Sequence, residues 1–361
     1  MQTWLSVSAS DLRYNAKTAI EYVNVPVIAV VKCNGYGMTT EYAARAWYDC
    51  GVRFFAVAEP NEAEELRELG YDDVEILLMS PVADVETLNS MLDCNVILTV
   101  TSAEKARFYV ENSNGKKIRS HVKVDTGMGR FGVRYDEFES LKAIYDVDGI
   151  DYCGIFSHFA LSFEPTYNKT KIQFEKFQKA LKYLADNNIE VGTRHIANSC
   201  AAIRFPETRL DAVRLGSALI GRLMRPTDLP LKRVGEFKAR VIDIRTLKTG
   251  DTTGYAMIAK AKKDTRCAVV AAGFRHGFGM ELTDDRMRFA DLLRNIRRCL
   301  RKFKKPEIMY WNGKPLKVVG RIGNQSALVD ISNYDVKSGD ILTANVNVLM
   351  IDDIVKRELT K

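Results

Sequence analysis

The sequence predicts an α/β protein with two domains: an N-terminal parallel (β/α)8 barrel, the TIM-barrel architecture, and a C-terminal, mostly antiparallel β domain. Three observations lead to this prediction. The chain has 361 residues, which is long for a single core. Eight apolar runs alternate with helical stretches through about the first 220 residues, and after about Pro230 short β runs replace the helices.

The predicted barrel strands are apolar runs bounded by turn residues, as expected for strands that are buried on both faces. Helical stretches separate them, and in YNKTKIQFEKFQKALKYLADNN the apolar residues stand three and four positions apart. An open doubly wound sheet is the alternative, but it predicts a GxGxxG fingerprint after the first strand, which is absent there. The eight runs are PVIAVVK, RFFAVA, EILLM, NVILTV, IRSHVKVD, IDYCGIFSHF, RHIAN and AVRLG.

The C-terminal part of the chain contains hardly any helical pattern, and Gly, Asp and Asn separate its short β runs. This pattern predicts a mostly antiparallel β domain over residues 231–361, following a barrel over residues 11–230. The β runs are RVIDIRTLKTGD, RCAVVAAGF, PLKVVGRI, SALVDIS and ILTANVNVLMI.

One segment of the β domain, residues 286–305, is strongly basic. It carries nine Arg or Lys and one acid, Asp291, so its net charge is about +8 while the rest of the chain is near neutral. Its apolar residues recur at helical spacing, which predicts a basic amphipathic helix. We expect the apolar face to pack on the β domain, with contact to a membrane surface or nucleic acid as the alternative. The apolar residues are Phe289, Leu292, Leu293, Ile296, Leu300 and Phe303.

The composition indicates a cytoplasmic protein. The seven cysteines include no close pair typical of a zinc or redox site, and their odd number argues against a secreted disulfide framework. Asp11 and Arg13 come too early for a signal peptide, and no apolar run reaches the roughly 18 to 20 residues that a membrane span needs. We therefore expect a cytoplasmic location, with no membrane span, no nucleic-acid partner and no metal site.

Polar residues follow several of the predicted barrel strands, where catalytic groups of such barrels gather. Lys32 ends the first strand, so its amine is either solvated or carries out chemistry such as imine formation with an aldehyde cofactor. The loops after strands seven and eight often bind phosphate, which Ser199 and the Gly216–Ser217 pair suit. This layout is the one that pyridoxal phosphate needs. The other residues at this mouth are Arg130, His158, Asn198 and Arg214.

Five ordered segments carry a resemblance to a known family: VVKCNGYG, HVKVDTGMGRFGVR, GIFSHFA, RHIANS and DAVRLGSALIGR. Together they resemble the alanine racemase family of fold-type III pyridoxal phosphate enzymes, over most of the chain. The resemblance implies a head-to-tail homodimer whose active sites combine the barrel of one subunit with the β domain of the other. It also implies that residues 1–10 join the β domain.

The resemblance assigns two catalytic bases. Racemisation needs a base on each face of Cα, because one face loses a proton while the other gains one. Lys32 would hold the cofactor covalently and act on one face, and Tyr255, in GDTTGYAMIAK, would act on the other face from the partner subunit.

The same resemblance assigns the residues around the cofactor. Arg214 would face the pyridine nitrogen, and because a guanidinium keeps its proton, the ring would draw less charge from Cα and side reactions would be suppressed. His195 would orient Arg214, and His158 would pack near the ring. The full cofactor set is Lys32, Tyr36, His158, His195, Asn198, Ser199, Arg214, Gly216 and Ser217.

At the substrate, Arg130 would bind the carboxylate in two places. Lys123 matches a lysine that some family members carry as a carbamate. An ungapped match puts Asn324 and Gln325 where the family has a methionine followed by an acid or amide, and a shift by one residue puts Gly323 and Asn324 there. An amide beside the substrate's β-carbon favours serine as well as alanine.

Other positions depart from the family's pattern. Phe274 replaces the usual tyrosine, His276 replaces an acid, and the C-terminal IVKRELTK lacks the usual arginine and tyrosine. The sequence thus predicts an isomerase, a pyridoxal phosphate racemase of alanine, with serine as the alternative substrate. The rival of another class is a barrel that carries the cofactor without turnover. A decarboxylase or aldolase would need a different partner-domain residue and usually a metal or a cysteine.

Overall fold

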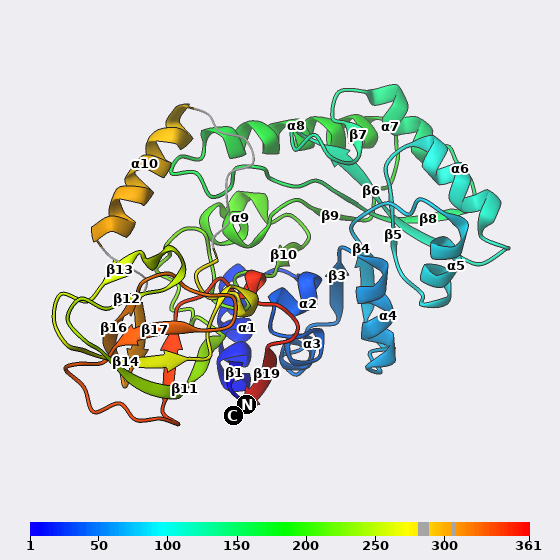
Figure 1. Ribbon diagram of the computed structural model, residues 1–361. Coiled ribbons are helices and arrows are strands. Elements are labelled where there is room, and N and C mark those ends of the chain that lie inside the picture. The colour runs from blue at the N-terminus through cyan, green and yellow to red at the C-terminus, as the bar shows by residue number, and fades with distance from the viewer. Residues whose placement is uncertain (281–288, 305–307) are drawn as a thin grey trace. The chain divides into compact units, whose positions relative to one another are not determined.

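The computed structural model describes residues 1–280, 289–304 and 308–361 (Figure 1). The chain divides into two compact units. One is Ala9–Val234, and the other combines Met1–Ser8 with Gly235–Lys361. From the sequence, the borders between the two units are predicted at residues 10 and 230, within a few residues of those in the structure.

The first unit is a parallel barrel, as predicted. Its strands form one sheet in the order β10-β2-β3-β4 and a second in the order β5-β6-β8-β9, with every pairing parallel. Parallel bridges from Leu77 to Ile97 and from Asn198 to Arg214 join the two sheets into a closed ring. The strands are β2 (Val27–Val30), β3 (Phe54–Val57), β4 (Glu75–Leu78), β5 (Leu98–Val100), β6 (Ile118–Asp125), β8 (Ile150–Phe156), β9 (Thr193–His195) and β10 (Val213–Leu215), with β7 (Val133–Arg134) paired to β6.

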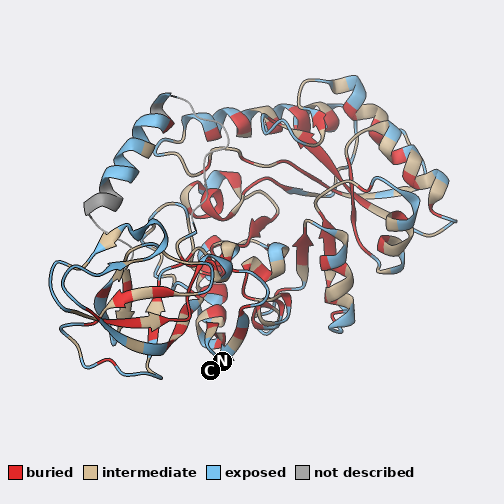
Figure 2. Cartoon of the chain, in the orientation of Figure 1, coloured by how far each residue is buried: buried red, intermediate tan, exposed pale blue. Residues whose placement is uncertain are grey.

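Helices alternate with the barrel strands along the chain, and local sequence explains where several begin. The side chains of Asp84, Ser102 and Asn198 each accept a backbone N–H bond in the first turn of the next helix. The strands are largely buried, as Figure 2 shows. The helices are α1 (Ala9–Val23), α2 (Lys32–Tyr36), α3 (Thr40–Tyr48), α4 (Pro60–Glu68), α5 (Val85–Asp93), α6 (Ala103–Asn112), α7 (Phe138–Tyr145), α8 (Asn168–Asp186), α9 (Ser199–Arg204) and the 3₁₀ turn η1 (Pro206–Thr208).

The second unit is built on an eight-stranded sheet in the order β14-β17-β16-β15-β18-β11-β1-β19. Between its described strands the pairings are antiparallel except that of β1 with β19, and the long strand β11 also pairs with β14. This confirms the mostly antiparallel prediction. The elements are β1 (Thr3–Ser8), β11 (Glu236–Leu247), β12 (Thr252–Thr253), η2 (Tyr255–Met257), β13 (Ala259–Lys260), β14 (Thr265–Val270), η3 (Phe274–His276), β15 (Ile308–Trp311), β16 (Lys314–Val319), β17 (Ala327–Asp330), β18 (Ile341–Ala344), η4 (Val348–Met350) and β19 (Lys356–Thr360).

Helix α10 (Phe289–Lys304) occupies most of the basic segment for which the sequence predicts a helix. The remaining positions of that prediction, 286–288 and 305, lie outside the described residues. The expected packing of its apolar face is wrong, because the apolar side chains of α10 that are described are exposed. Among the described residues, no helix is long and apolar enough to cross a membrane.

Candidate active site

The turn that carries Lys32 has an unusual backbone. Strand β2 ends at Val30, and α2 then runs through Cys33 (φ 56°), Asn34 (φ 51°) and Tyr36 (φ 56°) in the left-handed region. L-residues avoid this region, at a cost of roughly 1–2 kcal/mol each. The turn therefore needs compensating contacts to hold Lys32 in place.

Glu62 supplies several of those contacts. Its carboxylate is buried and accepts backbone N–H bonds from Cys33 (2.5 Å), Ala58 (2.8 Å) and Glu59 (3.1 Å). Three donors satisfy a carboxylate that burial would otherwise penalise. Glu62 thus ties the residue after Lys32 to the start of α4. The sequence analysis missed this role, although the capping-box pattern of EPNE could have pointed to Glu62.

Hydroxyls and amides converge beyond strands β9 and β10. The Ser199 hydroxyl accepts from the backbone N–H groups of Gly216 (3.0 Å) and Ala218 (3.2 Å). A Cβ on Gly216 would overlap the hydroxyl of Tyr36, so glycine is needed for this close approach. Burial, and to a smaller extent Cys33 and Glu62, raises the pKa of Tyr36 well above its usual value, so its hydroxyl keeps its proton. Four of the predicted cofactor residues therefore meet here: Tyr36, Ser199, Gly216 and the adjoining Ser217.

Arg214 lies at the centre of a buried chain of hydrogen bonds. Its Nη1 donates to His195 Nδ1 (2.7 Å), and its Nη2 donates to the Ser157 carbonyl (2.7 Å) and contacts His158 Nδ1 (3.1 Å). His195 Nε2 in turn lies 2.9 Å from His121 Nδ1. Because a guanidinium only donates, His195 Nδ1 must accept, so its proton sits on Nε2 and is donated to His121. These two bonds, from Arg214 to His195 and from His195 to His121, fix the direction of the chain.

The three histidines that contact Arg214 or one another, His121, His158 and His195, are neutral at ordinary pH. Burial, together with the charges of Arg119 and Arg214, lowers the pKa of His121 to about 3. Burial and Arg214 also hold the pKa values of His158 and His195 well below their usual range. Burial lowers the pKa of Arg214 to about 10, which still leaves it charged. His121 was not among the predicted site residues, although it opens the HVKVD motif that was.

Lys123 is buried beside this chain. Its Nζ donates to the Val124 carbonyl at 2.9 Å and lies 5.2 Å from the ring centre of Phe156. Burial, reinforced by Arg214 and Arg130, lowers the pKa of Lys123 to about 7. A large share of the amine is therefore unprotonated at neutral pH, as addition of CO₂ to form a carbamate requires.

Arg130 is exposed, in the turn after β6. The Asp125 carboxylate organises that turn by accepting backbone N–H bonds from Gly127 (2.9 Å), Met128 (2.8 Å) and Gly129 (3.1 Å). Partial burial would raise the pKa of Asp125, but these bonds outweigh it and lower the pKa. The positive charge of Arg130 contributes, after burial and Arg214, to the lowered pKa values of Lys123 and His158.

Tyr255 belongs to the second unit and Lys32 to the first. The tyrosine opens η2, and its side chain is 74% exposed. Positive φ angles at Gly254 (78°), Ala256 (61°) and Met257 (50°) shape the turn around it. It borders a pocket of about 430 Å³, lined by Arg245, Thr253, Gly254, Tyr255, Val269, Val319, Arg321, Gly323, Ser326, Ala327 and Leu328.

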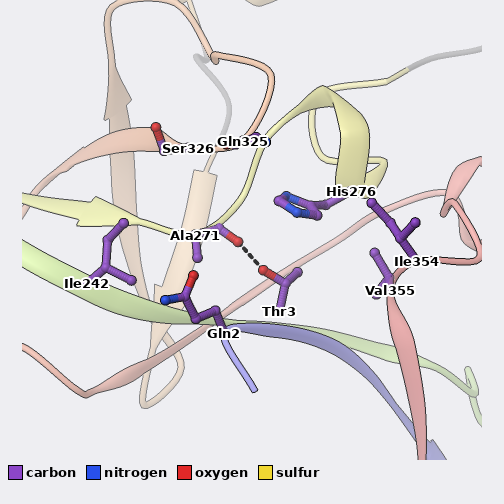
Figure 3. A pocket seen from close by; sticks show the side chains of 9 residues that line it. All are labelled: Gln2, Thr3, Ile242, Ala271, His276, Gln325, Ser326, Ile354 and Val355. Carbon is purple, nitrogen blue, oxygen red and sulfur yellow. Dashed lines mark hydrogen bonds between the residues drawn. The ribbon is translucent and has the colours of Figure 1, made fainter.

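Neither Asn324 nor Gln325, the two residues that the ungapped match puts at the substrate, lines that pocket. Gly323 lines it, whereas Asn324 is exposed and uses its carbonyl to accept from the Arg275 N–H at 3.0 Å. Gln325 lines a second pocket, of about 420 Å³, in the same unit, and Figure 3 shows it across that pocket from Gln2. The second pocket is lined by Gln2, Thr3, Ile242, Ala271, His276, Gln325, Ser326, Ile354 and Val355.

Comparisons with known proteins match both units of the chain to the domains of one family. The family domain described as "Alanine racemase, N-terminal domain" matches residues 7–223, and "Alanine racemase, C-terminal domain" matches residues 234–357. The alanine racemase of Desulforamulus reducens is 31% identical over 91% of this chain and 86% of its own length. That of Methanococcus maripaludis is 29% identical over 94% of this chain and 88% of its own.

Solved structures of the same family share the fold. The alanine racemase of Clostridium difficile 630 has a TM-score of 0.87 and 25% identity, covering 100% of this chain and 96% of that one. The alanine racemase from Bacillus anthracis, solved with bound L-Ala-P, has a TM-score of 0.85 and 24% identity, covering 100% and 95%. Both matches extend through the barrel and the β domain.

Proposed function

The chain belongs to the alanine racemase family, and on that premise we propose that it is an isomerase that interconverts L- and D-alanine with bound pyridoxal phosphate. The observation that carries the proposal is the convergence of Tyr36, Ser199 and the Gly216 amide at the barrel mouth. The Tyr36 and Ser199 hydroxyls and the N–H of the adjoining Ser217 are donors of the kind that a phosphate needs, while the Gly216 N–H donates to Ser199 and so positions its hydroxyl. The charged Arg214 nearby suits a ring nitrogen that accepts a hydrogen bond.

In this proposal each residue has a defined task. Tyr36, Ser199 and the Gly216 and Ser217 backbone would hold the cofactor's phosphate, and the Lys32 amine would hold its aldehyde carbon. When bound, the cofactor draws electrons from the substrate's Cα and so makes the hydrogen there acidic. The direction of the hydrogen bonds from Arg214 through His195 keeps the guanidinium oriented for the ring nitrogen.

Proton exchange at Cα uses one base on each face. Lys32 acts from the barrel, and Tyr255 of the partner subunit acts from the other side. Arg130 binds the substrate carboxylate and thereby fixes which bond at Cα points toward each base. Lys123, whose pKa the Arg130 charge helps to lower, would as a carbamate carry a negative charge that attracts the Arg130 guanidinium. The homodimer is part of the proposal because each site takes one base from each subunit.

Serine is the second candidate substrate. Gly323 lines the pocket of Tyr255 and has no side chain there, whereas relatives commonly have a methionine if the match is shifted by one residue. The missing side chain leaves space for a hydroxymethyl group, which a methyl-sized pocket would exclude.

Chiral chromatography of single L-amino acids incubated with the purified protein tests the proposal. A racemate of alanine supports it, and a comparable rate with L-serine supports the second candidate. No turnover despite bound cofactor would indicate a carrier barrel, and amine or aldehyde fragments would indicate a decarboxylase or aldolase. Loss of the cofactor's absorbance in Lys32→Ala would separately check the attachment point.

A further inference from the structure

Helix α10 exposes a continuous apolar face. The residues of this face stand three or four positions apart, so they project from one side of the helix. Figure 2 colours most of α10 as exposed. Five large side chains share the face: Phe289 (76% exposed), Leu292 (43%), Leu293 (45%), Ile296 (47%) and Leu300 (58%). Single exposed apolar residues are ordinary, but a contiguous stripe marks an interaction surface.

The rest of the helix is basic. Its sequence contains six Arg or Lys and one acid, Asp291, which gives a net charge of +5 over Phe289–Lys304. Arg294 forms an ion pair with Asp291 at 3.1 Å, while Arg297 and Arg298 are exposed. An aromatic and leucine-rich face beside an arginine-rich face is typical of helices that lie in the plane of a membrane interface.

We propose that α10 binds the surface of an anionic lipid bilayer. Its apolar face inserts among the headgroups and upper acyl chains, and its arginines contact lipid phosphates. The helix has 16 residues and many charges, so it lies on the bilayer and does not cross it.

Charge and shape favour this occupant over two others. Two copies of α10 packed face to face would bring two helices of charge +5 together without compensating acids. Nucleic acid would use the basic face but would leave the exposed apolar stripe without a partner. An anionic bilayer accepts both faces at once. The proposal is independent of racemase activity, because no residue of α10 belongs to the cofactor site or to either pocket described above.

Vesicle co-sedimentation of the full-length, cofactor-loaded protein tests this proposal. We expect binding to vesicles of equal parts phosphatidylcholine and phosphatidylglycerol that is at least about tenfold tighter than to phosphatidylcholine alone, and that weakens as salt rises. The double variant Leu293→Ser/Ile296→Ser should lose binding through the apolar face. The double variant Arg297→Glu/Arg298→Glu should lose it through the basic face. All four side chains are exposed, so both variants should keep the wild-type racemase rate and circular dichroism.

A matched control distinguishes a specific effect of α10 from an effect of the protein's net charge. Lys262→Glu/Lys263→Glu makes the same charge change at two exposed lysines of the same unit, and it should bind vesicles nearly as wild type does. Equal binding to neutral and anionic vesicles, or wild-type binding by both α10 variants, would overturn the proposal. So would a fall in oligomeric mass of the Leu293→Ser/Ile296→Ser variant in sedimentation velocity, which would assign the face to a second copy. Binding to a DNA duplex but not to vesicles would overturn it as well.

Discussion

The two halves of the proposed catalytic pair are held in different ways. In the barrel, the buried Glu62 carboxylate holds the strained turn after Lys32, and a separate buried chain of hydrogen bonds runs from Arg214 through His195 to His121. Tyr255 has a side chain that is 74% exposed within its own chain. The barrel half is therefore preorganised by its own unit, whereas the tyrosine is presented outward, which suits the proposed sharing of the site between subunits.

This contrast predicts two kinds of mutational effect. A buried polar network strengthens its members mutually, so removing one of them leaves others without partners. An exposed hydroxyl has water as a replacement partner and contributes little to folding. Changes in the barrel network should therefore lower both stability and activity, while changes at Tyr255 should lower activity alone.

The largest effect is expected from Tyr255→Phe. Removal of one of two bases should slow racemisation by about 10²–10⁴-fold, with a melting temperature within a degree or so of wild type because the hydroxyl is exposed. Exchange of the Cα hydrogen with solvent deuterium, started separately from L- and D-alanine, should be reduced more from one enantiomer than from the other. Equal losses would argue against one base on each face. A large fall in melting temperature would remove the contrast between the two halves.

The next effect is expected from His195→Ala in the barrel network. The substitution leaves an N–H donor of Arg214 and the Nδ1 acceptor of His121 buried without their partner. Urea denaturation should show a free energy of unfolding that is lower by about 3 kcal/mol. Turnover should fall as well, since Arg214 loses its orientation. His276→Ala, at a half-buried histidine of the β domain, is the control and should cost less stability. Similar losses in both variants would show that the barrel network is no more cooperative than the β domain.

The sequence predicted the barrel more completely than the site, and the reason is physical. Strand periodicity reports burial, which local residues decide, so eight apolar runs such as PVIAVVK were sufficient to predict the ring of β2 to β10. Long-range pairings, such as that of Glu62 with Cys33 or of His121 with His195, depend on which segments meet in space, and a single sequence carries no record of that. For α10, periodicity predicted which residues share the apolar face, but it could not predict whether another part of the protein covers that face.

The effect expected from the titration of Lys123 is smaller when it is counted per pH unit. Burial lowers its folded-state pKa to about 7, below the usual lysine value of about 10.4, so between these values the unfolded chain binds more protons than the folded one. The free energy of unfolding should therefore rise with pH across this window, by at most about 1.4 kcal/mol per pH unit from this group. Below about pH 7 both states bind the proton, so this group no longer makes stability depend on pH. Lys123→Met should flatten the curve in CO₂-free buffer. An unchanged slope would mean that Lys123 is solvated or already carbamylated.

The smallest effect is expected from Glu62→Gln, which also separates positioning from folding most finely. The amide keeps the size of the side chain but presents one oxygen and an NH₂ group to the three N–H donors of Cys33, Ala58 and Glu59. At least one of the three N–H groups then has no acceptor, so the free energy of unfolding should fall by about 1–2 kcal/mol. Because the strained turn then holds Lys32 less firmly, kcat should fall several-fold with little change in KM. Glu68→Gln, at an exposed position of the same helix, should alter neither quantity. If the Glu62 variant lost stability but kept its kcat, the carboxylate would act only as a cap of α4 and would not position Lys32. The preorganisation of the barrel half would then come from the Arg214 chain alone.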